Sequence, residues 1–225
     1  MYSIAIDGPA GAGKSTIAKT IAKKLGFVYV DTGAMYRAIA LYFLRKGVDG
    51  KDKEKIAELC PDIQVTIEYI DGEQQVFLNG ENVSHLIRTE EVGTMASLTA
   101  AQPAVREALL QLQRDMAKNA DILMDGRDIG TNVLPNADLK IYLTASVTVR
   151  AKRRFDELKA KGVECVLAEI EQDIEERDHQ DMTREIAPLK QAEDAVLVDS
   201  SDMTIEEVAD AVIGAFYRVK EEAAK

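Results

Sequence analysis

The stretch Gly8-Pro9-Ala10-Gly11-Ala12-Gly13-Lys14-Ser15 matches the phosphate-binding pattern G-x4-G-K-[ST]. An apolar run, Ser3–Asp7, precedes it and a run with helical spacing follows it, as that pattern requires. Glycines let the backbone turn its N–H groups toward an anion, Lys14 can reach terminal phosphates, and the Ser15 hydroxyl can bind Mg²⁺. The stretch therefore predicts a nucleoside triphosphate site, and the alternative is an ordinary glycine-rich turn between a strand and a helix.

Short apolar runs alternate with helical stretches along the chain, and they are Ser3–Asp7, Phe27–Asp31, Ile122–Asp125, Leu139–Leu143 and Ala195–Asp199. Strands separated by helices indicate a parallel sheet with helices on both faces. A capping box of Thr204 and Glu207 predicts the start of the last helix. The expected apolar face of that helix consists of Ile205, Val208, Val212, Ala215 and Phe216.

Two stretches break this alternation. Between Asp62 and Val83, the hairpin signals Asp71-Gly72 and Asn79-Gly80 separate three short runs and predict a small antiparallel insertion.

The second exception, Arg150 to Arg184, is rich in charge of both signs and poor in large apolar residues, so we expect it to project from the core. Its spaced charges form two groups, which are Arg150, Arg153 and Arg154 on one helical face, and Arg177, Asp181 and Arg184 on another. The alternative is a pair of solvated helices with i,i+4 ion pairs such as Arg153 with Glu157.

The composition limits the possible partners. A net charge of −11 over 225 residues would repel nucleic acid and anionic membrane surfaces, so neither is an expected partner. The two cysteines and two histidines are too scattered for a zinc site that could be read from the sequence. No segment is long enough to span a bilayer and the first residues do not look like a signal peptide, so we expect a cytoplasmic protein.

The run Asp125-Gly126-Arg127-Asp128 follows a predicted strand, at the edge where open α/β sheets bind ligands. Asp125 could bind Mg²⁺ through water, Arg127 could hold a phosphate with two hydrogen bonds, and Asp128 could recognise a polar group of a second substrate. The alternative for the acids is a cap or turn role after the strand.

The run Asp31–Arg37 adds a hydroxyl group, a tyrosine and an arginine at the end of the second predicted strand, before a helix expected up to Lys46. Its alternative interpretation is a helix N-cap by Thr32 with an exposed Arg37.

The guanine-reading pattern N-K-x-D and the switch pattern D-x-x-G are absent, which disfavours a switch GTPase. A phosphotransferase needs arginines around the transferring group and a lid that excludes water, and residues 150–184 supply candidates for both.

The quoted runs together resemble the bacterial cytidylate kinases over nearly the whole chain. They are Gly8–Ser15, Asp31–Arg37, Val105–Ala108, Asp125–Thr131, Glu176–Asp178 and Ala187–Leu189. The resemblance implies transfer of the ATP γ-phosphoryl group to CMP or dCMP by a monomer that uses Mg²⁺. It implies one α/β domain over residues 1–225 with the three-layer P-loop kinase fold, a five-stranded parallel sheet, a small antiparallel β insertion and a helical lid.

The resemblance also implies boundaries: a core of residues 1–33, 104–148 and 186–225, a monophosphate-binding part of residues 34–103 with the insertion at 62–83, and a lid of residues 149–185. The implied catalytic residues are Lys14, Arg127, Arg177 and Arg184. The implied ATP-binding residues are Gly8, Pro9, Ala10, Gly11, Ala12, Gly13, Lys14, Ser15, Thr16 and Arg154. The metal would be held by Ser15 directly and by Asp125 through water.

For CMP, the resemblance implies contacts from two stretches of the chain as well as the lid. Ser97, Arg106 and Asp128 would face the cytosine, and Arg37 and Arg127 its phosphate. Arg177 and Asp181 would contact the ribose, Arg184 would reach the phosphates, and Thr32 and Tyr36 complete the set.

No general base is evident, and none is needed, because a phosphate monoester has a second pKa of about 6 and its oxygen is already ionised at neutral pH. Two alternatives stay open. One is another P-loop kinase with a small acceptor such as UMP, shikimate or dephospho-coenzyme A. The other is a nucleotide-binding switch or regulator without turnover.

Overall fold

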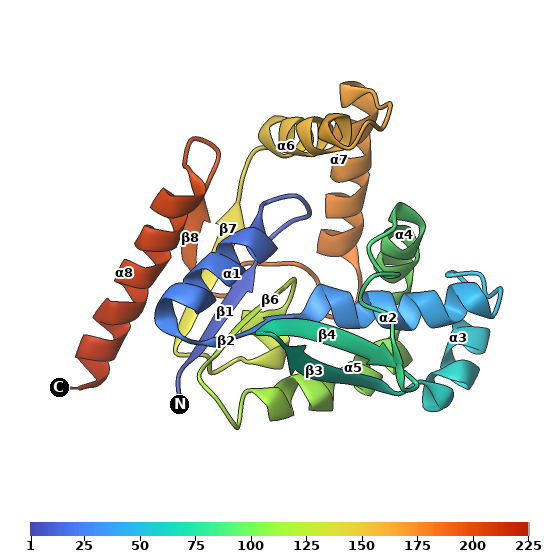
Figure 1. Ribbon diagram of the computed structural model, residues 1–225, viewed down its shortest axis with the longest axis horizontal. Helices are drawn as coiled ribbons and strands as arrows, with labels where there is room; N and C mark the ends of the chain where they lie inside the picture. The colour runs from blue at the N-terminus through green and yellow to red at the C-terminus, as the bar shows by residue number, and fades with distance from the viewer. Residues whose placement is uncertain (225) are drawn as a thin grey trace. The chain divides into compact units, whose positions relative to one another are not determined.

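The computed structural model describes residues 1–224 of the chain. Its backbone divides into two compact units, one formed by Met1–Tyr29 with Ala120–Lys225 and the other by Val30–Asn119. Figure 1 shows both with the element labels used below.

A five-stranded sheet lies mainly in the first unit. Its strands are β1 (Ser3–Asp7), β2 (Val28–Asp31), β6 (Ile122–Gly126), β7 (Leu139–Thr144) and β8 (Val196–Asp199). They follow the order β2-β6-β1-β7-β8, and β1 pairs in parallel with both β6 and β7. The predicted strands are thus confirmed to within two residues at their ends, and their carboxyl ends meet at one edge.

Helices α1 (Lys14–Leu25) and α8 (Ile205–Ala223) bury their apolar sides against each other and against the sheet. The Phe216 ring makes edge contacts with the rings of Tyr2 and Phe27, at centroid distances of 5.4 and 5.3 Å. The capping box of Thr204 and Glu207 is confirmed. Ile205 is 49% exposed and was wrongly assigned to the apolar face, because it begins the first turn of the helix, before the buried stretch.

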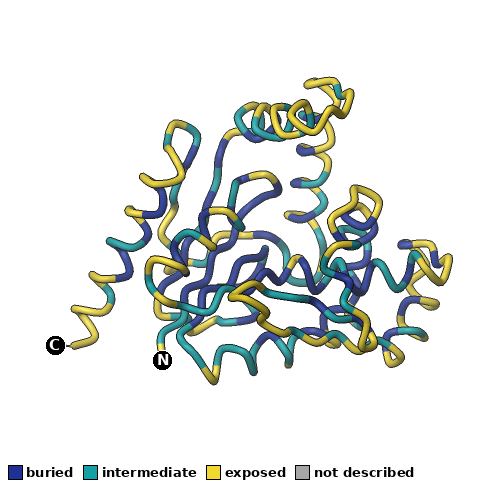
Figure 2. Tube along the Cα trace, viewed as in Figure 1, coloured by how far each residue is buried: buried dark blue, intermediate teal, exposed yellow. Residues whose placement is uncertain are grey.

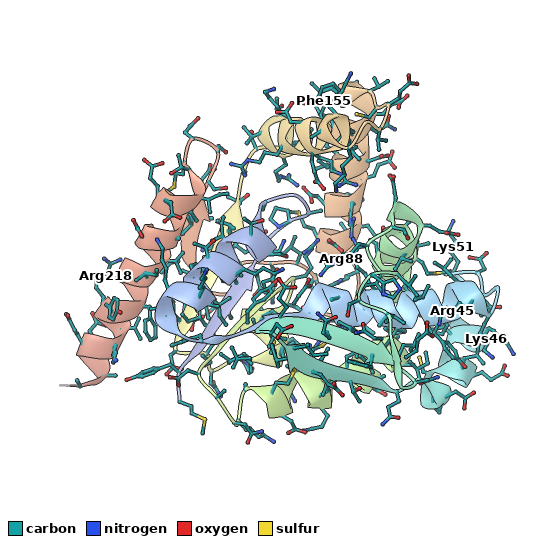
Figure 3. All side chains as sticks on the ribbon, in the orientation of Figure 1. Arg45, Lys46, Lys51, Arg88, Phe155 and Arg218 are labelled. Atoms are coloured by element: carbon teal, nitrogen blue, oxygen red, sulfur yellow. The ribbon has the colours of Figure 1, made fainter. Side chains whose placement is uncertain are left out.

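Helices α6 (Val147–Ala160) and α7 (Leu167–Thr183) form a hairpin, and Figure 1 shows β7 leading directly into α6. A small core of its own, centred on Ala151, Ile170 and Ile174, holds the pair together. The α6 residue Phe155, labelled in Figure 3, packs on that core. Figure 2 shows that much of the outer surface of both helices is exposed.

The ion pair between Arg153 and Glu157, the example given for the alternative of solvated helices, is not the contact that these residues make. Arg153 instead donates to the backbone oxygen of Ser200 at 2.7 Å, while Glu157 pairs with Arg154 at 3.0 Å and with Lys161. A contact with a residue 47 positions away thus replaces the local pair.

The second unit consists of helices around a small antiparallel sheet. Its elements are α2 (Thr32–Arg45), α3 (Lys53–Leu59), the short 3₁₀ helix η1 (Cys60–Asp62), β3 (Val65–Ile70), β4 (Glu73–Leu78), β5 (Glu81–Asn82), α4 (Glu90–Thr99) and α5 (Pro103–Met116). The strand order β3-β4-β5 confirms the antiparallel insertion. Both hairpin turns, Asp71-Gly72 and Asn79-Gly80, have positive φ at both positions, which is typical of tight hairpin turns.

Helix α2 begins at Thr32 itself, so the residue that caps it is Asp31 and not Thr32. Asp31 is the N-cap, since its side chain accepts a hydrogen bond from the backbone N–H of Ala34 at 2.9 Å. Thr32 is the first helical residue and is buried. The N-cap interpretation of Thr32 is therefore wrong. Among the described residues, no helix is long and apolar enough to cross a membrane.

Candidate active site

The phosphate loop joins β1 to α1 and is shaped by glycines. Gly11 and Gly13 have φ angles of 74° and 85°. A side chain at Gly8 would place its Cβ 1.9 Å from the Leu143 backbone oxygen of β7, so the loop can lie against that strand only with glycine there. Within the described chain no side chain caps the first turn of α1, which leaves backbone N–H groups that suit an anion.

Lys14 is buried beside this loop, and its Nζ donates to the backbone oxygen of Pro9 at 2.7 Å. Burial, followed by the positive charge of Arg127, lowers the pKa of Lys14 to about 7. Burial makes the charged form of Lys14 unfavourable. An anionic ligand would stabilise that form, because it places a negative charge beside the ammonium group.

Ser15 and Asp125 come together at the carboxyl edge of the sheet. The Ser15 hydroxyl donates to Asp125 Oδ2 at 3.1 Å, and the Tyr29 hydroxyl donates to Asp125 Oδ1 at 2.8 Å. A hydroxyl oxygen and a carboxylate fit Mg²⁺, which takes few protein ligands and keeps phosphate and water oxygens. No group of three metal-binding side chains occurs among residues 1–224, so a metal at this point would need the nucleotide's phosphates as ligands.

Asp7, which the sequence analysis did not assign to the site, holds the loop that carries Asp128. Its two carboxylate oxygens accept from the backbone N–H groups of Ile129 and Gly130, both at 2.7 Å, at the start of the short π-type turn η2 (Ile129–Val133). Burial raises the pKa of Asp7 to about 6. The sequence offers one indication of this role. Asp7 is the last residue of β1, at the same edge of the sheet as Asp125, which is the last residue but one of β6.

Arg127 and Asp128 meet the end of α7 in a charged cluster. Arg127 Nε donates to Asp181 Oδ2 at 2.9 Å. Arg184 lies 3.5 Å from Asp128 Oδ1 and 3.7 Å from Asp181 Oδ1. Burial raises the pKa of Asp181, but Arg127, Arg184 and Arg177 together outweigh it, so the pKa is lowered overall and the carboxylate is charged. The cluster thus presents two arginines and two carboxylates to a ligand.

Arg184 is not on the helical face where we expected it. Helix α7 ends at Thr183, and the Arg184 backbone is extended, with its Nε donating to the Ala187 oxygen at 2.7 Å. Arg177 does lie on α7, where its buried Nε has no hydrogen-bond partner among the described residues. Arg154 is 41% exposed at its side chain and pairs with Glu157 on its own helix.

The second unit holds the other residues expected at CMP. Arg37 on α2 donates to the backbone oxygens of Ile87 and Thr89 at 3.1 and 3.2 Å. A Cβ at Gly93 would lie 3.0 Å from the Arg37 guanidinium, so glycine leaves room for that group. Arg88, labelled in Figure 3, was not predicted, although it pairs with the buried Asp31 at 2.7 Å and has an exposed side chain.

Tyr36 and Arg106 form a second contact in this unit. The Arg106 guanidinium lies 5.5 Å from the centroid of the Tyr36 ring, and Arg106 Nη1 donates to the Ala100 oxygen at 3.1 Å. Ser97 lies on α4, between these helices in sequence, and Thr32 begins α2. The packing of α2 with α4 and α5 thus positions this group of residues.

A glycine-rich loop between a parallel strand and a helix, with a buried lysine beside it and arginines near the same sheet edge, is the arrangement of a P-loop nucleotide-binding protein. The cytidylate kinase family model matches residues 4–218. The chain is 51% identical over 217 residues to the cytidylate kinase of Caldicellulosiruptor bescii, with 96% of each chain covered. It is 54% identical over 211 residues to that of Listeria welshimeri, with 93% of each covered. The chain belongs to the cytidylate kinase family.

Solved structures support the fold. A gluconokinase from Sinorhizobium meliloti has a TM-score of 0.52 at 13% identity, with 99% of this chain and 95% of that chain covered. An uncharacterized protein from Eubacterium ventriosum has a TM-score of 0.54 at 11% identity, with 96% and 98% covered. With the strand order above, these similarities confirm the predicted fold class.

Proposed function

We infer that the chain is an ATP-dependent kinase that transfers the γ-phosphoryl group of ATP to CMP or dCMP and releases ADP with CDP or dCDP. The observation that carries this function is the identity of about half of all residues with curated cytidylate kinases, over nearly the full length of each chain. The intact phosphate loop and the buried Lys14 agree with it, because both suit a nucleoside triphosphate.

On the donor side, the triphosphate would bind the backbone N–H groups of residues 8–16 and the ammonium group of Lys14. Arg154, which pairs with Glu157 in the structure, is proposed to turn toward ATP. Mg²⁺, held by Ser15 and through water by Asp125, would neutralise charge on the phosphates.

On the acceptor side, we propose ten residues as contacts of the monophosphate. They are Arg127, Asp128, Arg177, Asp181 and Arg184, with Thr32, Tyr36, Arg37, Ser97 and Arg106. The chemistry supports this set, because arginines bind phosphate with two parallel hydrogen bonds and a carboxylate can accept from the N4 amine of cytosine.

The reaction needs alignment and neutralisation of charge more than proton transfer. A monophosphate oxygen is already ionised at neutral pH, since its second pKa is about 6, and it can attack the γ-phosphorus without a base. Lys14, Arg127, Arg177 and Arg184 would stabilise the charge on the transferring group. Helices α6 and α7 would exclude water, which would otherwise hydrolyse ATP.

We further propose a cytoplasmic monomer that binds no nucleic acid. The net charge of −11 supports the last point, because polyanions would be repelled. The location is supported by the substrates, which are nucleotides of general metabolism, and the monomeric state rests on the family resemblance alone.

The test is an acceptor panel with Mg²⁺ and ATP, followed by ADP release. CMP and dCMP should be phosphorylated at least tenfold more efficiently than UMP, AMP, GMP or shikimate. A preference for shikimate or UMP would indicate another small-acceptor kinase. ATP binding without turnover on any acceptor would indicate a nucleotide-binding regulator instead.

A further inference from the structure

Arg150 on α6 makes three hydrogen bonds to three different parts of the first unit. Its Nε donates to the Ala145 oxygen after β7 at 2.9 Å, and its Nη1 donates to the Ala10 oxygen of the phosphate loop at 2.8 Å. Its Nη2 donates to Asp178 Oδ2 on α7 at 2.6 Å. The residue is 3% exposed, so one buried guanidinium connects the sheet, the loop and the helix.

On the loop side, Arg150 fixes the direction of a peptide unit. The C=O and N–H groups of a trans peptide point in opposite directions, so holding the Ala10 oxygen outward turns the Gly11 N–H away from Arg150. A Cβ at Gly11 would lie 3.4 Å from the Arg150 Cβ, which shows how closely the loop approaches α6. Arg150 thereby orients one of the N–H groups offered to the triphosphate.

On the helix side, the partner of Arg150 lies among the residues proposed to bind CMP. Asp178 follows Arg177 directly and precedes Asp181 by three positions, which is nearly one turn of α7. Holding Asp178 therefore limits rotation and sliding of the helix that carries both. The second oxygen of Asp178, Oδ1, is buried and has no hydrogen-bond partner among residues 1–224.

The buried ion pair between Arg150 and Asp178 is not expected to contribute much to the stability of the fold. A buried ion pair gains little net free energy over apolar side chains of the same size, because both ions lose their hydration. Helices α6 and α7 already share an apolar core that includes Ala151 and Ile174. Hydrogen bonds depend on direction, whereas apolar contacts do not. The Arg150–Asp178 pair, with its hydrogen bond to the phosphate loop, can therefore fix the orientation of α7 relative to the loop.

We propose that Arg150 is a positioning residue that couples ATP binding to CMP binding, by linking the phosphate loop with α7 through Asp178. The inference rests on the proposed function. When the triphosphate orders the loop, the Ala10 oxygen and Arg150 become fixed, and Asp178 holds α7 in the orientation that CMP requires. Each nucleotide then tightens the binding of the other by the same factor.

The experiment measures the dissociation constant of CMP by calorimetry, with Mg²⁺ present, with and without a saturating non-hydrolysable ATP analogue. The ratio of the two constants is the coupling factor, expected at about 5 to 150 in the wild type. Arg150→Lys keeps the charge but cannot span three acceptors, and Asp178→Asn keeps the size of the side chain but removes its charge. Each variant should bring the coupling factor close to 1. The coupling factor of the double variant should equal that of either single variant.

Arg153→Lys is the matched control, because Arg153 lies on the same helix and also donates to a backbone oxygen, that of Ser200. Its coupling factor should equal that of the wild type. Should Arg150→Lys fail to fold in a thermal scan, Asp178→Asn decides the question alone.

A wild-type factor of 1, or a factor kept in both variants, overturns the link and leaves the kinase assignment intact. A wild-type chain that binds the ATP analogue but no CMP overturns the proposed function and the link together.

Discussion

Arg127, which directly follows β6, and Asp181 on α7 are joined by a hydrogen bond of 2.9 Å between Nε and Oδ2, and both side chains are largely buried. Burial lowers the pKa of Arg127, but the attraction of Asp181, with that of Asp125 and Asp178, outweighs it and the pKa is raised, so both groups keep their charges. A buried arginine that is already partly neutralised can accept a phosphate without a large desolvation cost. Asp181 is therefore a link between the sheet edge and α7 as well as a proposed ribose contact.

Asp181→Asn should weaken CMP binding more than ATP binding, because the amide leaves the Arg127 charge without its nearest opposite charge. Hydrogen bonds to charged groups contribute about 1.5–3 kcal/mol, so KM for CMP should rise roughly tenfold to hundredfold. Steady-state kinetics with each substrate varied in turn gives the two KM values. Asp173→Asn on the exposed side of α7 is the control, and an unchanged KM for CMP in Asp181→Asn would remove Asp181 from the acceptor site.

Asp128→Asn should narrow the preference for CMP over UMP. Asp128 is 3% exposed and accepts from Asn132 Nδ2 at 3.1 Å, so its carboxylate is held in place. A carboxylate accepts from the N4 amine of cytosine but opposes the O4 oxygen of uracil, while an amide can donate to O4. The ratio of kcat/KM for CMP and UMP should fall roughly tenfold to hundredfold. A variant with the wild-type ratio and full CMP turnover would leave Asp128 a turn residue.

The strands, the phosphate loop and the hairpin turns could be predicted because each depends on residues close together in the sequence. The N-cap of α2 could not, since Asp31 and Thr32 are both good capping residues and only the backbone decides between them. Asp7 was missed because its partner Ile129 lies 122 residues away.

The three arginines of α6 show the same limit. Arg150 and Arg153 lie three positions apart on neighbouring parts of one helical face. Arg150 nevertheless donates a hydrogen bond to the phosphate loop, whereas Arg153 donates to the turn at Ser200. Periodicity gives a face of a helix, but the partner of each side chain depends on what the fold brings to that face.

Lys14→Met should slow phosphoryl transfer strongly without unfolding the protein. Loss of one preorganised charged donor costs about 2.7–4 kcal/mol of transition-state stabilisation, or a hundredfold to a thousandfold in kcat. The pKa of Lys14 is lowered to about 7, so its stabilising effect on the native state decreases as the pH falls from about 10 through 7. At pH 7 the buried ammonium group therefore costs the native state stability, so its removal should leave the Tm at pH 7 equal to or above that of the wild type. Single-turnover assays and thermal unfolding measure both, and a kcat within tenfold of the wild type would contradict the prediction.

Asp7 should make stability depend on pH in an unusual direction. Its pKa rises from 3.8 to about 6 on folding, so the native state binds more protons between these values. Stability from this group is fully present below about pH 4 and is lost as the pH rises through 6, a change of about 3 kcal/mol at about 1.4 kcal/mol per pKa unit. Urea unfolding at pH 4, 5, 6 and 7 should show this decline in the wild type relative to Asp7→Asn. Parallel curves for the two proteins would show that folding does not raise the pKa of Asp7.

Hydrogen exchange should show that α6 and α7 close over the bound nucleotides. This helix pair has only a small core around Ala151 and Ile170, much of its outer surface is exposed, and the buried Nε of Arg177 has no partner within the described chain. Segments with few buried contacts open readily, and phosphates would supply partners for the lid arginines. Exchange across residues 149–185 should slow at least tenfold when CMP and a non-hydrolysable ATP analogue are added together, while α8 should not change. Equal protection with and without both ligands would instead favour a rigid pair of solvated helices held by surface ion pairs.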